Sequence, residues 1–326
     1  MSVHLPNDVA TGPREVASAF LVGAPRCGTT FLAKTLAAHP NVCLSKPKET
    51  HFFVRDAPGL PPERWRDVFL ARHFGHLAPE ATLIVEGSPL QLRDSAAIER
   101  LLRFDPQARF VVALRNPIEM IHSFHARLVF LLDEDEPDFE RAWALQAERA
   151  RGERIPKRCR DVASLQYRTM ASLGTQLERL VERVGRERVH VVVFDDVASA
   201  PLAAYHALLS FLGLPDDGRT RFKRTNEHRT FRHAWAQAWV MNPPRVVMAW
   251  LEARQRRGRS RPEWLRSLRR RIKRWNTRRA RRAPLSPAMR ARLQVELADE
   301  IGRLESLLGR DLSPWRAPEE PVAEAS

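Results

Sequence analysis

The feature that most constrains this chain is a short apolar segment, residues 19–22, that leads directly into a turn between Gly23 and Gly28. After the turn, apolar side chains recur at helical spacing from Phe31 to Leu36. A strand, a glycine-bearing turn and a helix in this order direct several backbone N–H groups and a helix N-terminus at one point. This arrangement predicts an anion site, most often for phosphate. An ordinary tight strand-to-helix turn is the alternative.

The turn differs from the loop that binds nucleoside triphosphates. Gly23 and Gly28 have the required spacing, but Thr29 stands where that loop carries a lysine. The lysine neutralises the β- and γ-phosphates, so its absence argues against a triphosphate. A kinase interpretation would still use residues 23–30 for the triphosphate. It would place magnesium at Asp195, which follows the apolar segment 189–194.

Residues 25–32, Pro-Arg-Cys-Gly-Thr-Thr-Phe-Leu, resemble the 5′-phosphosulfate loop of the sulfotransferases. These enzymes use 3′-phosphoadenylyl sulfate (PAPS), and their loop usually has Lys at the position of Arg26. The resemblance implies that Arg26 stabilises charge on the transferred group. It also implies that the loop supplies cofactor contacts from Arg26, Cys27, Gly28, Thr29, Thr30 and Phe31.

A second β-to-α junction carries a second signal for phosphate. The continuous apolar run 110–114 predicts a buried parallel strand. Arg115 follows it, at the end of the strand where open α/β sheets bind ligands, and Ser123 lies about two helical turns further on. A guanidinium fork suits a phosphate dianion. This pair resembles the family's 3′-phosphate site. Arg115 capping a sheet edge and Ser123 on a helix surface are the alternatives.

A dense polar group at residues 46–50 runs into aromatic residues at 52 and 53. It resembles the K-E-x-x-F-F stretch of carbohydrate-type and bacterial sulfotransferases, which implies that Glu49 is the general base that takes the acceptor's proton. The alternative is a surface ion pair of Glu49 with Lys46 or Lys48. His51 is the second candidate base.

Two other positions follow from the same resemblance. Tyr167, in a predicted helix over 165–184, would help to anchor the cofactor or the acceptor, with simple burial as an equal alternative. Arg229, or else Arg232, would close the cofactor site from a basic loop.

The charge of the chain is concentrated in one segment. Residues 254–282 hold 15 Lys/Arg and one acid, a net +14 of the total +15, so the rest is nearly neutral. Within this segment Trp264, Leu268, Ile272 and Trp275 form one helical stripe. Such a helix can lie on an anionic membrane surface or pack on its own domain. Nonspecific binding of nucleic acid is the least favoured alternative.

Composition sets further limits. No apolar run approaches the roughly 20 residues of a membrane-spanning helix, and residues 1–16 read as a flexible leader without an apolar core. The three cysteines show no metal-binding spacing. We therefore expect a cytoplasmic protein that works without a metal, with peripheral contact at the inner membrane surface through residues 254–282.

Together these patterns predict an α/β fold of three layers around a central parallel sheet, similar to the P-loop NTPases. The domain would span 17–316, with a Trp/Arg-rich helical insertion at 235–282, a final helix at 285–308 and a disordered acidic tail at 317–326. The resemblance implies in-line transfer of a sulfuryl group from PAPS to a hydroxyl of a carbohydrate, a lipid or a small molecule. A nucleotide-dependent kinase and a non-enzymatic basic adaptor that binds membrane or nucleic acid are the alternatives.

Overall fold

The computed structural model describes residues 16–222, 229–241, 245–256, 262–279 and 282–317. The chain divides into two compact units, which are described separately below. The sheet unit contains the described residues of 16–24, 29–114 and 179–222, and the helical unit contains those of 25–28, 115–178 and 229–317. Residues 1–15 of the predicted leader, residues 318–326 of the predicted tail and residues 223–228 lie outside the described residues.

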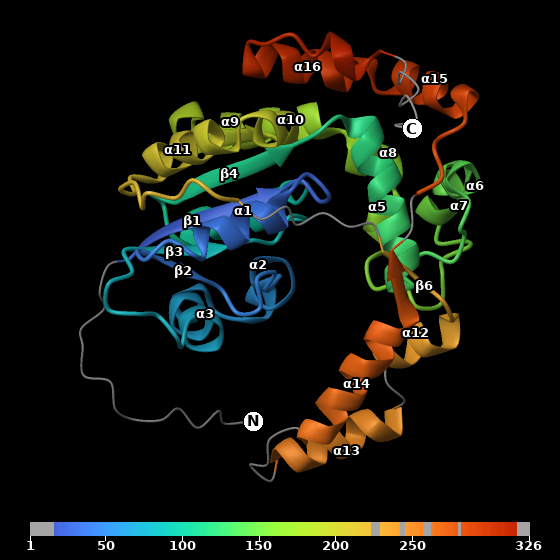
Figure 1. The fold of residues 1–326 in the computed structure, drawn as a ribbon, viewed down its shortest axis with the longest axis horizontal. Helices are drawn as coiled ribbons and strands as arrows, with labels where there is room; N and C mark the ends of the chain where they lie inside the picture. The colour runs from blue at the N-terminus through green and yellow to red at the C-terminus, as the bar shows by residue number, and fades with distance from the viewer. Residues whose placement is uncertain (1–15, 223–228, 242–244, 257–261, 280–281, 318–326) are drawn as a thin grey trace. The chain divides into compact units, whose positions relative to one another are not determined.

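The sheet unit is built on five parallel strands in the order β2-β3-β1-β4-β5. Figure 1 shows β4, β1 and β3 side by side. The strands are β1 (Ala17–Gly23), β2 (Val42–Leu44), β3 (Leu83–Glu86), β4 (Arg109–Leu114) and β5 (Val189–Val193). The predicted α/β class and the parallel sheet are therefore confirmed.

Strands β1 and β4 consist mainly of apolar residues and are buried along most of their length. Phe20 of β1 lies beside Phe110 of β4 in the sheet register. Its ring also packs edge-on against Phe53 and Phe104, with ring centroids 5.7 and 6.1 Å away. Such buried aromatic clusters supply much of a domain's hydrophobic stabilisation. The cluster is extended by Phe52 and Phe69.

Helices connect the strands, and local signals fix their ends. Asp94 caps α4 by accepting a hydrogen bond from the Ala97 N–H, and Gly213 ends α11 in the left-handed conformation at φ 66°. The helices of this unit are α1 (Thr29–Leu36), α2 (Phe52–Arg55), α3 (Trp65–His73), α4 (Ser95–Phe104), α10 (Phe194–Ser199) and α11 (Pro201–Leu212). Helix α9 (Leu173–Val184) has residues in both units.

The main element of the helical unit is α5 (Pro117–Leu131). Asn116 caps its N-terminus by accepting a hydrogen bond from the Ile118 N–H. Proline at the first helical position favours this start. The other helices of the unit are α6 (Phe139–Ala144), α7 (Gln146–Ala150), α8 (Tyr167–Ala171), α12 (Ala234–Met241), α13 (Arg245–Arg256), α14 (Glu263–Asn276), α15 (Pro287–Glu296) and α16 (Ala298–Leu308). A short antiparallel pair, β6 (Arg229–Phe231) and β7 (Thr277–Arg279), brings the two ends of the Trp/Arg-rich segment together.

Two predicted helices are each divided in the structure. The helix expected over 165–184 breaks at Ser172, and the Glu300 carboxylate accepts hydrogen bonds from the N–H and hydroxyl of Thr175 at the start of α9. The helix expected over 285–308 breaks at Leu297 into α15 and α16. Hydrophobic periodicity continues across both breaks, so it could not locate them. Among the described residues, no helix is long and apolar enough to cross a membrane.

Candidate functional site

The glycines of the loop at residues 23–28 are required by two different constraints. Gly28 has φ 94°, a conformation that L side chains rarely adopt. At Gly23 the reason is close packing, because a Cβ atom there would lie 2.6 Å from Cβ of Leu92. The loop therefore keeps its shape through one conformational and one steric requirement.

Arg26 has a positive φ of 64°, which is uncommon for a residue with a side chain. The residue is partly exposed to solvent, and its Nε donates a hydrogen bond to Oγ of Ser123 at 3.0 Å. The structure thus brings together two predicted site residues that are 97 positions apart in the sequence. Ser123 lies on α5 and is 5% exposed.

Several guanidinium groups gather around this pair. Partial burial and the nearby charges of Arg127, Arg282 and Arg115 lower the pKa of Arg26. Arginine still keeps its charge at neutral pH because its ordinary pKa is very high. Arg26 thus lies near three other arginines, and an anion bound among them would be stabilised by their charge. Arg115, Arg26 and Ser123 were predicted from the sequence, whereas Arg127 and Arg282 were not.

Glu119, one turn into α5, holds part of this cluster in position. Its carboxylate accepts hydrogen bonds from Arg282 at 3.1 Å and Arg290 at 2.7 Å, and it lies 4.0 Å from Arg115. We name Arg26, Arg115, Arg127 and Arg282 the arginine cluster.

In the sheet unit, Lys48 lies next to the first residue of α1. Its Nζ is 3.4 Å from Oγ1 of Thr29 and 2.9 Å from Oε1 of Glu49. The surface ion pair that was the alternative interpretation of Glu49 is therefore present. The Glu49 side chain remains 43% exposed, and His51 Nε2 lies 3.9 Å from its other oxygen.

A buried carboxylate supports the segment that carries Glu49. Glu86 is 1% exposed and accepts hydrogen bonds from the N–H and the hydroxyl of Thr50, both at 3.0 Å. It also accepts from the N–H and the hydroxyl of Ser88, and the Ser88 hydroxyl oxygen accepts from the His51 N–H. Burial raises the pKa of Glu86, and these hydrogen bonds oppose the shift. Glu86 is a positioning residue for this loop.

Replacing Glu86 by alanine is expected to lower the free energy of unfolding by about 2–3 kcal/mol, because several buried donors would lose their acceptor. Chemical denaturation monitored by circular dichroism measures the loss. The matched control is Glu63→Ala, at an exposed position of the same unit. A similar small loss in both variants would contradict the supporting role of Glu86.

An aromatic pair flanks the start of α1. The rings of Phe31 and Phe222 lie with centroids 6.2 Å apart, and Tyr205 packs edge-on against Phe222 at 5.4 Å. Phe31 was a predicted cofactor contact. Phe222 was not predicted, because a single Phe before a basic loop has no distinctive pattern.

Tyr167 is fully buried in the helical unit, as the burial alternative expected. Its hydroxyl donates to the Glu134 carboxylate, which also receives two hydrogen bonds from Arg149, both 2.6 Å long. The Glu134 and Arg149 side chains have no exposed surface. Burial, together with the Glu134 charge, raises the pKa of Tyr167. These contacts account for Tyr167 as a structural residue.

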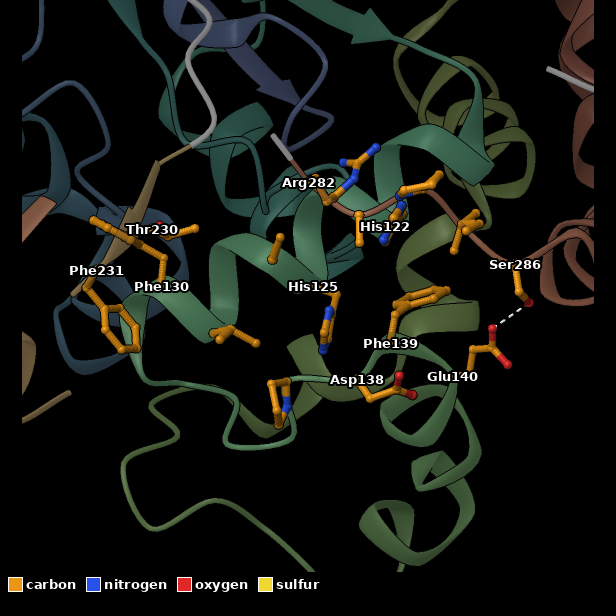
Figure 2. Close-up of a pocket in the computed structure, with 16 residues that line it drawn as sticks. His122, His125, Phe130, Asp138, Phe139, Glu140, Thr230, Phe231, Arg282 and Ser286 are labelled. Atoms are coloured by element: carbon orange, nitrogen blue, oxygen red, sulfur yellow. Dashed lines mark hydrogen bonds between the residues drawn. The ribbon is translucent and has the colours of Figure 1, made fainter. Parts of the chain in front are cut away.

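A cavity of about 350 Å³ lies along α5 in the helical unit. Figure 2 shows the rings of His122 and His125 projecting from α5 toward Phe139, whose centroid is 5.2 and 5.4 Å from theirs. Arg282, a member of the arginine cluster, also lines it. Most of the remaining wall is apolar: Ala126, Val129, Phe130, Pro137, Phe231, Ala283, Pro284 and Leu285.

The other predicted positions are less informative. Thr30 is exposed, Cys27 is buried with its Sγ 3.6 Å from the Pro25 carbonyl oxygen, and the side chain of Arg229 lies outside the described residues. Asp195 is exposed in the first turn of α10. Within the described ranges, no group of three or more His, Cys, Asp or Glu side chains is arranged to hold a metal ion.

Comparisons with known proteins agree with this fold. Residues 66–218 match the model of the sulfotransferase family. Carbohydrate sulfotransferase 15 of Homo sapiens is 28% identical over 144 residues, which covers 32% of this chain and 26% of the relative, and the Mus musculus protein gives the same figures. The match thus spans about a quarter of the length of these relatives.

A solved structure, a sulfotransferase from Alicyclobacillus acidocaldarius, shares the fold with a TM-score of 0.62 at 23% identity. The alignment covers 92% of this chain and 99% of that one. Residues 66–218 of this chain therefore resemble the sulfotransferase family, and the chain shares its fold with a sulfotransferase of known structure.

Proposed function

We propose that this protein transfers the sulfuryl group of PAPS to a hydroxyl group of an acceptor. The observation that carries the proposal is the hydrogen bond between Arg26 and Ser123 inside the arginine cluster. Residues from two separate phosphate-type motifs meet there. A cofactor with phosphate at both its 5′ and 3′ positions would satisfy both motifs.

The chain would divide the binding of PAPS among its own groups. Backbone N–H groups of residues 26–30 and the Thr29 and Thr30 hydroxyls would hold the 5′-phosphate. Arg115 and Ser123 would hold the 3′-phosphate, with Arg127 and Arg282 adding positive charge. The Phe31 and Phe222 rings offer a surface on which a purine can stack. Arg229 stays a proposed contact through sequence position alone.

PAPS supplies an activated sulfuryl group with adenosine 3′,5′-bisphosphate as its leaving group. In the proposed step the acceptor oxygen forms a bond to sulfur while the bond from sulfur to the 5′-phosphate oxygen breaks. Glu49 accepts the hydroxyl proton, and Arg26 stabilises the negative charge that develops on the departing oxygen. The products are a sulfate ester and adenosine 3′,5′-bisphosphate. No metal is required.

The ion pair of Glu49 with Lys48 is compatible with this role. The Glu49 side chain stays 43% exposed beside Lys48, so an acceptor hydroxyl can still reach its carboxylate. Lys48 also approaches Thr29 of the proposed 5′-phosphate site, so it links the base to that site. His51 remains the second candidate base.

The cavity along α5 is the proposed site of the acceptor. One wall carries Arg282 of the arginine cluster and His122, the neighbour of Ser123, and the remainder is mostly apolar. This lining favours an acceptor with an apolar body, a lipid or an aromatic alcohol, over a free sugar. A carbohydrate acceptor is suggested by the names of the relatives.

Calorimetric titration with adenosine 3′,5′-bisphosphate in EDTA, with ATP as the control, tests the proposal. We expect metal-free binding of the bisphosphate and much weaker binding of ATP, because Thr29 replaces the lysine that a triphosphate needs. ATP binding that appears only when magnesium is restored would favour the kinase alternative. If neither nucleotide bound, the adaptor alternative would stand and the proposed function would be wrong.

A further inference from the structure

The Trp/Arg-rich segment exposes apolar side chains that a globular protein would normally bury. Trp235 is 68% exposed, Trp264 63%, Trp275 50% and Leu268 38%. Trp235 lies on α12 and the other three lie on α14, and the two helices pack on each other. We name these four residues the tryptophan face. Its members on α14 lie within one stripe of the helix because their spacings are four and seven residues.

Polar groups occupy the buried side of the same two helices. Asn276 is fully buried and exchanges hydrogen bonds with the backbone of His233 at 2.8 and 3.1 Å. Gln237 is also fully buried and donates to the Phe130 carbonyl oxygen at 2.6 Å. These contacts fix the orientation of α12 and α14, so the tryptophan face cannot turn inward without breaking buried hydrogen bonds.

The tryptophan face is also internally ordered. The Trp275 ring stacks on His233 with centroids 5.2 Å apart and lies 6.3 Å from the Trp235 ring. Aromatic side chains held in place lose little conformational freedom when they bind. Several large apolar side chains exposed on neighbouring helices mark an interaction site.

Cations border the tryptophan face. Arg271 and Arg274 are exposed on α14 and, by helical geometry, lie beside the stripe of Trp264, Leu268 and Trp275. Residues 254–282 together carry a net charge of +14. A partner that complements both the exposed apolar side chains and the surrounding arginines would have a negatively charged surface over an apolar layer.

We infer that the tryptophan face docks on an anionic lipid bilayer, with α14 lying in the interfacial plane. Tryptophan prefers the membrane–water interface, and arginine can extend its charged end to lipid phosphates while its stem stays in apolar surroundings. Leu268 distinguishes this partner from a nucleic acid, since an aliphatic side chain between tryptophans gains by entering acyl chains and offers no stacking surface to bases.

Sedimentation with vesicles tests the inference on the full chain. We expect binding to vesicles of equal parts phosphatidylcholine and phosphatidylglycerol, and little binding to phosphatidylcholine alone. The double variant Trp264→Ser/Leu268→Ser removes two exposed side chains and should weaken binding roughly tenfold or more. The matched control is Val295→Ser, which removes an apolar side chain that is 79% exposed on α15. Thermal melting checks that each variant is folded.

The second variant, Arg271→Gln/Arg274→Gln, should weaken vesicle binding roughly 30-fold, as expected for two cations at an anionic surface. Adenosine 3′,5′-bisphosphate binding should be unchanged in both variants, so this test is independent of the proposed function. Three results would overturn the inference: no binding to anionic vesicles, full binding by Trp264→Ser/Leu268→Ser, or preferential binding to single-stranded RNA that blocks vesicle binding.

Discussion

Replacing Arg115 by alanine is expected to weaken the binding of adenosine 3′,5′-bisphosphate by about 10- to 150-fold. A charge-assisted hydrogen bond to phosphate contributes about 1.5–3 kcal/mol. Adenosine 5′-phosphate, which lacks the 3′-phosphate, should bind the variant almost as well as it binds the unmodified protein. Calorimetric titration of both nucleotides gives the two affinity ratios.

Arg303→Ala is the control for this experiment. Arg303 forms an exposed ion pair with Glu178 at 2.9 Å in the same unit, away from the arginine cluster, and exposed pairs contribute little. Its loss should leave both affinities unchanged. If Arg115→Ala weakened the binding of both nucleotides equally, Arg115 would not bind the 3′-phosphate. The proposal that residues 26–30 bind the 5′-phosphate would be unaffected.

Replacing Arg149 by methionine is expected to lower the free energy of unfolding by about 3–5 kcal/mol at neutral pH. The substitution leaves the Glu134 carboxylate charged, buried and without its bidentate partner. Urea denaturation followed by circular dichroism measures the effect. The double variant Glu134→Gln/Arg149→Met removes both charges and should recover a large part of the loss, which a double-mutant cycle reports as coupling.

The same pair predicts how stability depends on pH. Arg149 and Tyr167 hold the pKa of Glu134 below its ordinary value. A depressed carboxyl pKa contributes stability that is present above the unfolded-state pKa, about 4.3, and is lost as the pH falls through the folded-state pKa. In Arg149→Met the buried carboxyl gains a proton at higher pH, so the penalty of the substitution should shrink on acidification. If the loss in free energy of unfolding caused by Arg149→Met were the same at pH 7 and at acidic pH, this account would be contradicted.

Much of the sheet unit could be predicted from the sequence, and the proposed cofactor motifs could be located in it, because the relevant signals are local. The apolar runs that form β1 and β4 are continuous over several residues. Arg26 lies in the turn after β1, and Arg115 directly follows β4. A turn that requires φ of 94° at residue 28 needs glycine whatever the rest of the chain does. Local backbone chemistry therefore sufficed for these assignments.

The sequence alone could not reveal contacts between distant segments. Arg282 was hidden in a run of arginines, and only tertiary structure brings its charge to Arg26 and its side chain to Glu119. The sequence also could not predict that Glu86 accepts hydrogen bonds from Thr50 and Ser88, since a glutamate at the end of a strand is ordinarily exposed. The breaks at Ser172 and Leu297 also depend on packing, because hydrophobic periodicity continues through both.

The sequence by itself determined the α/β architecture, the two β-to-α junctions that we propose as phosphate sites, and the concentration of positive charge, because each arises from residues close together in the chain. Only the tertiary structure decided which charges meet, which carboxylates are buried and which side of α14 faces outward. Those properties depend on burial and on contacts between segments that are separated in the sequence, such as Arg26 and Ser123, which are 97 positions apart. Hydrogen bonds from buried Asn276 and Gln237 keep the tryptophans of α12 and α14 exposed.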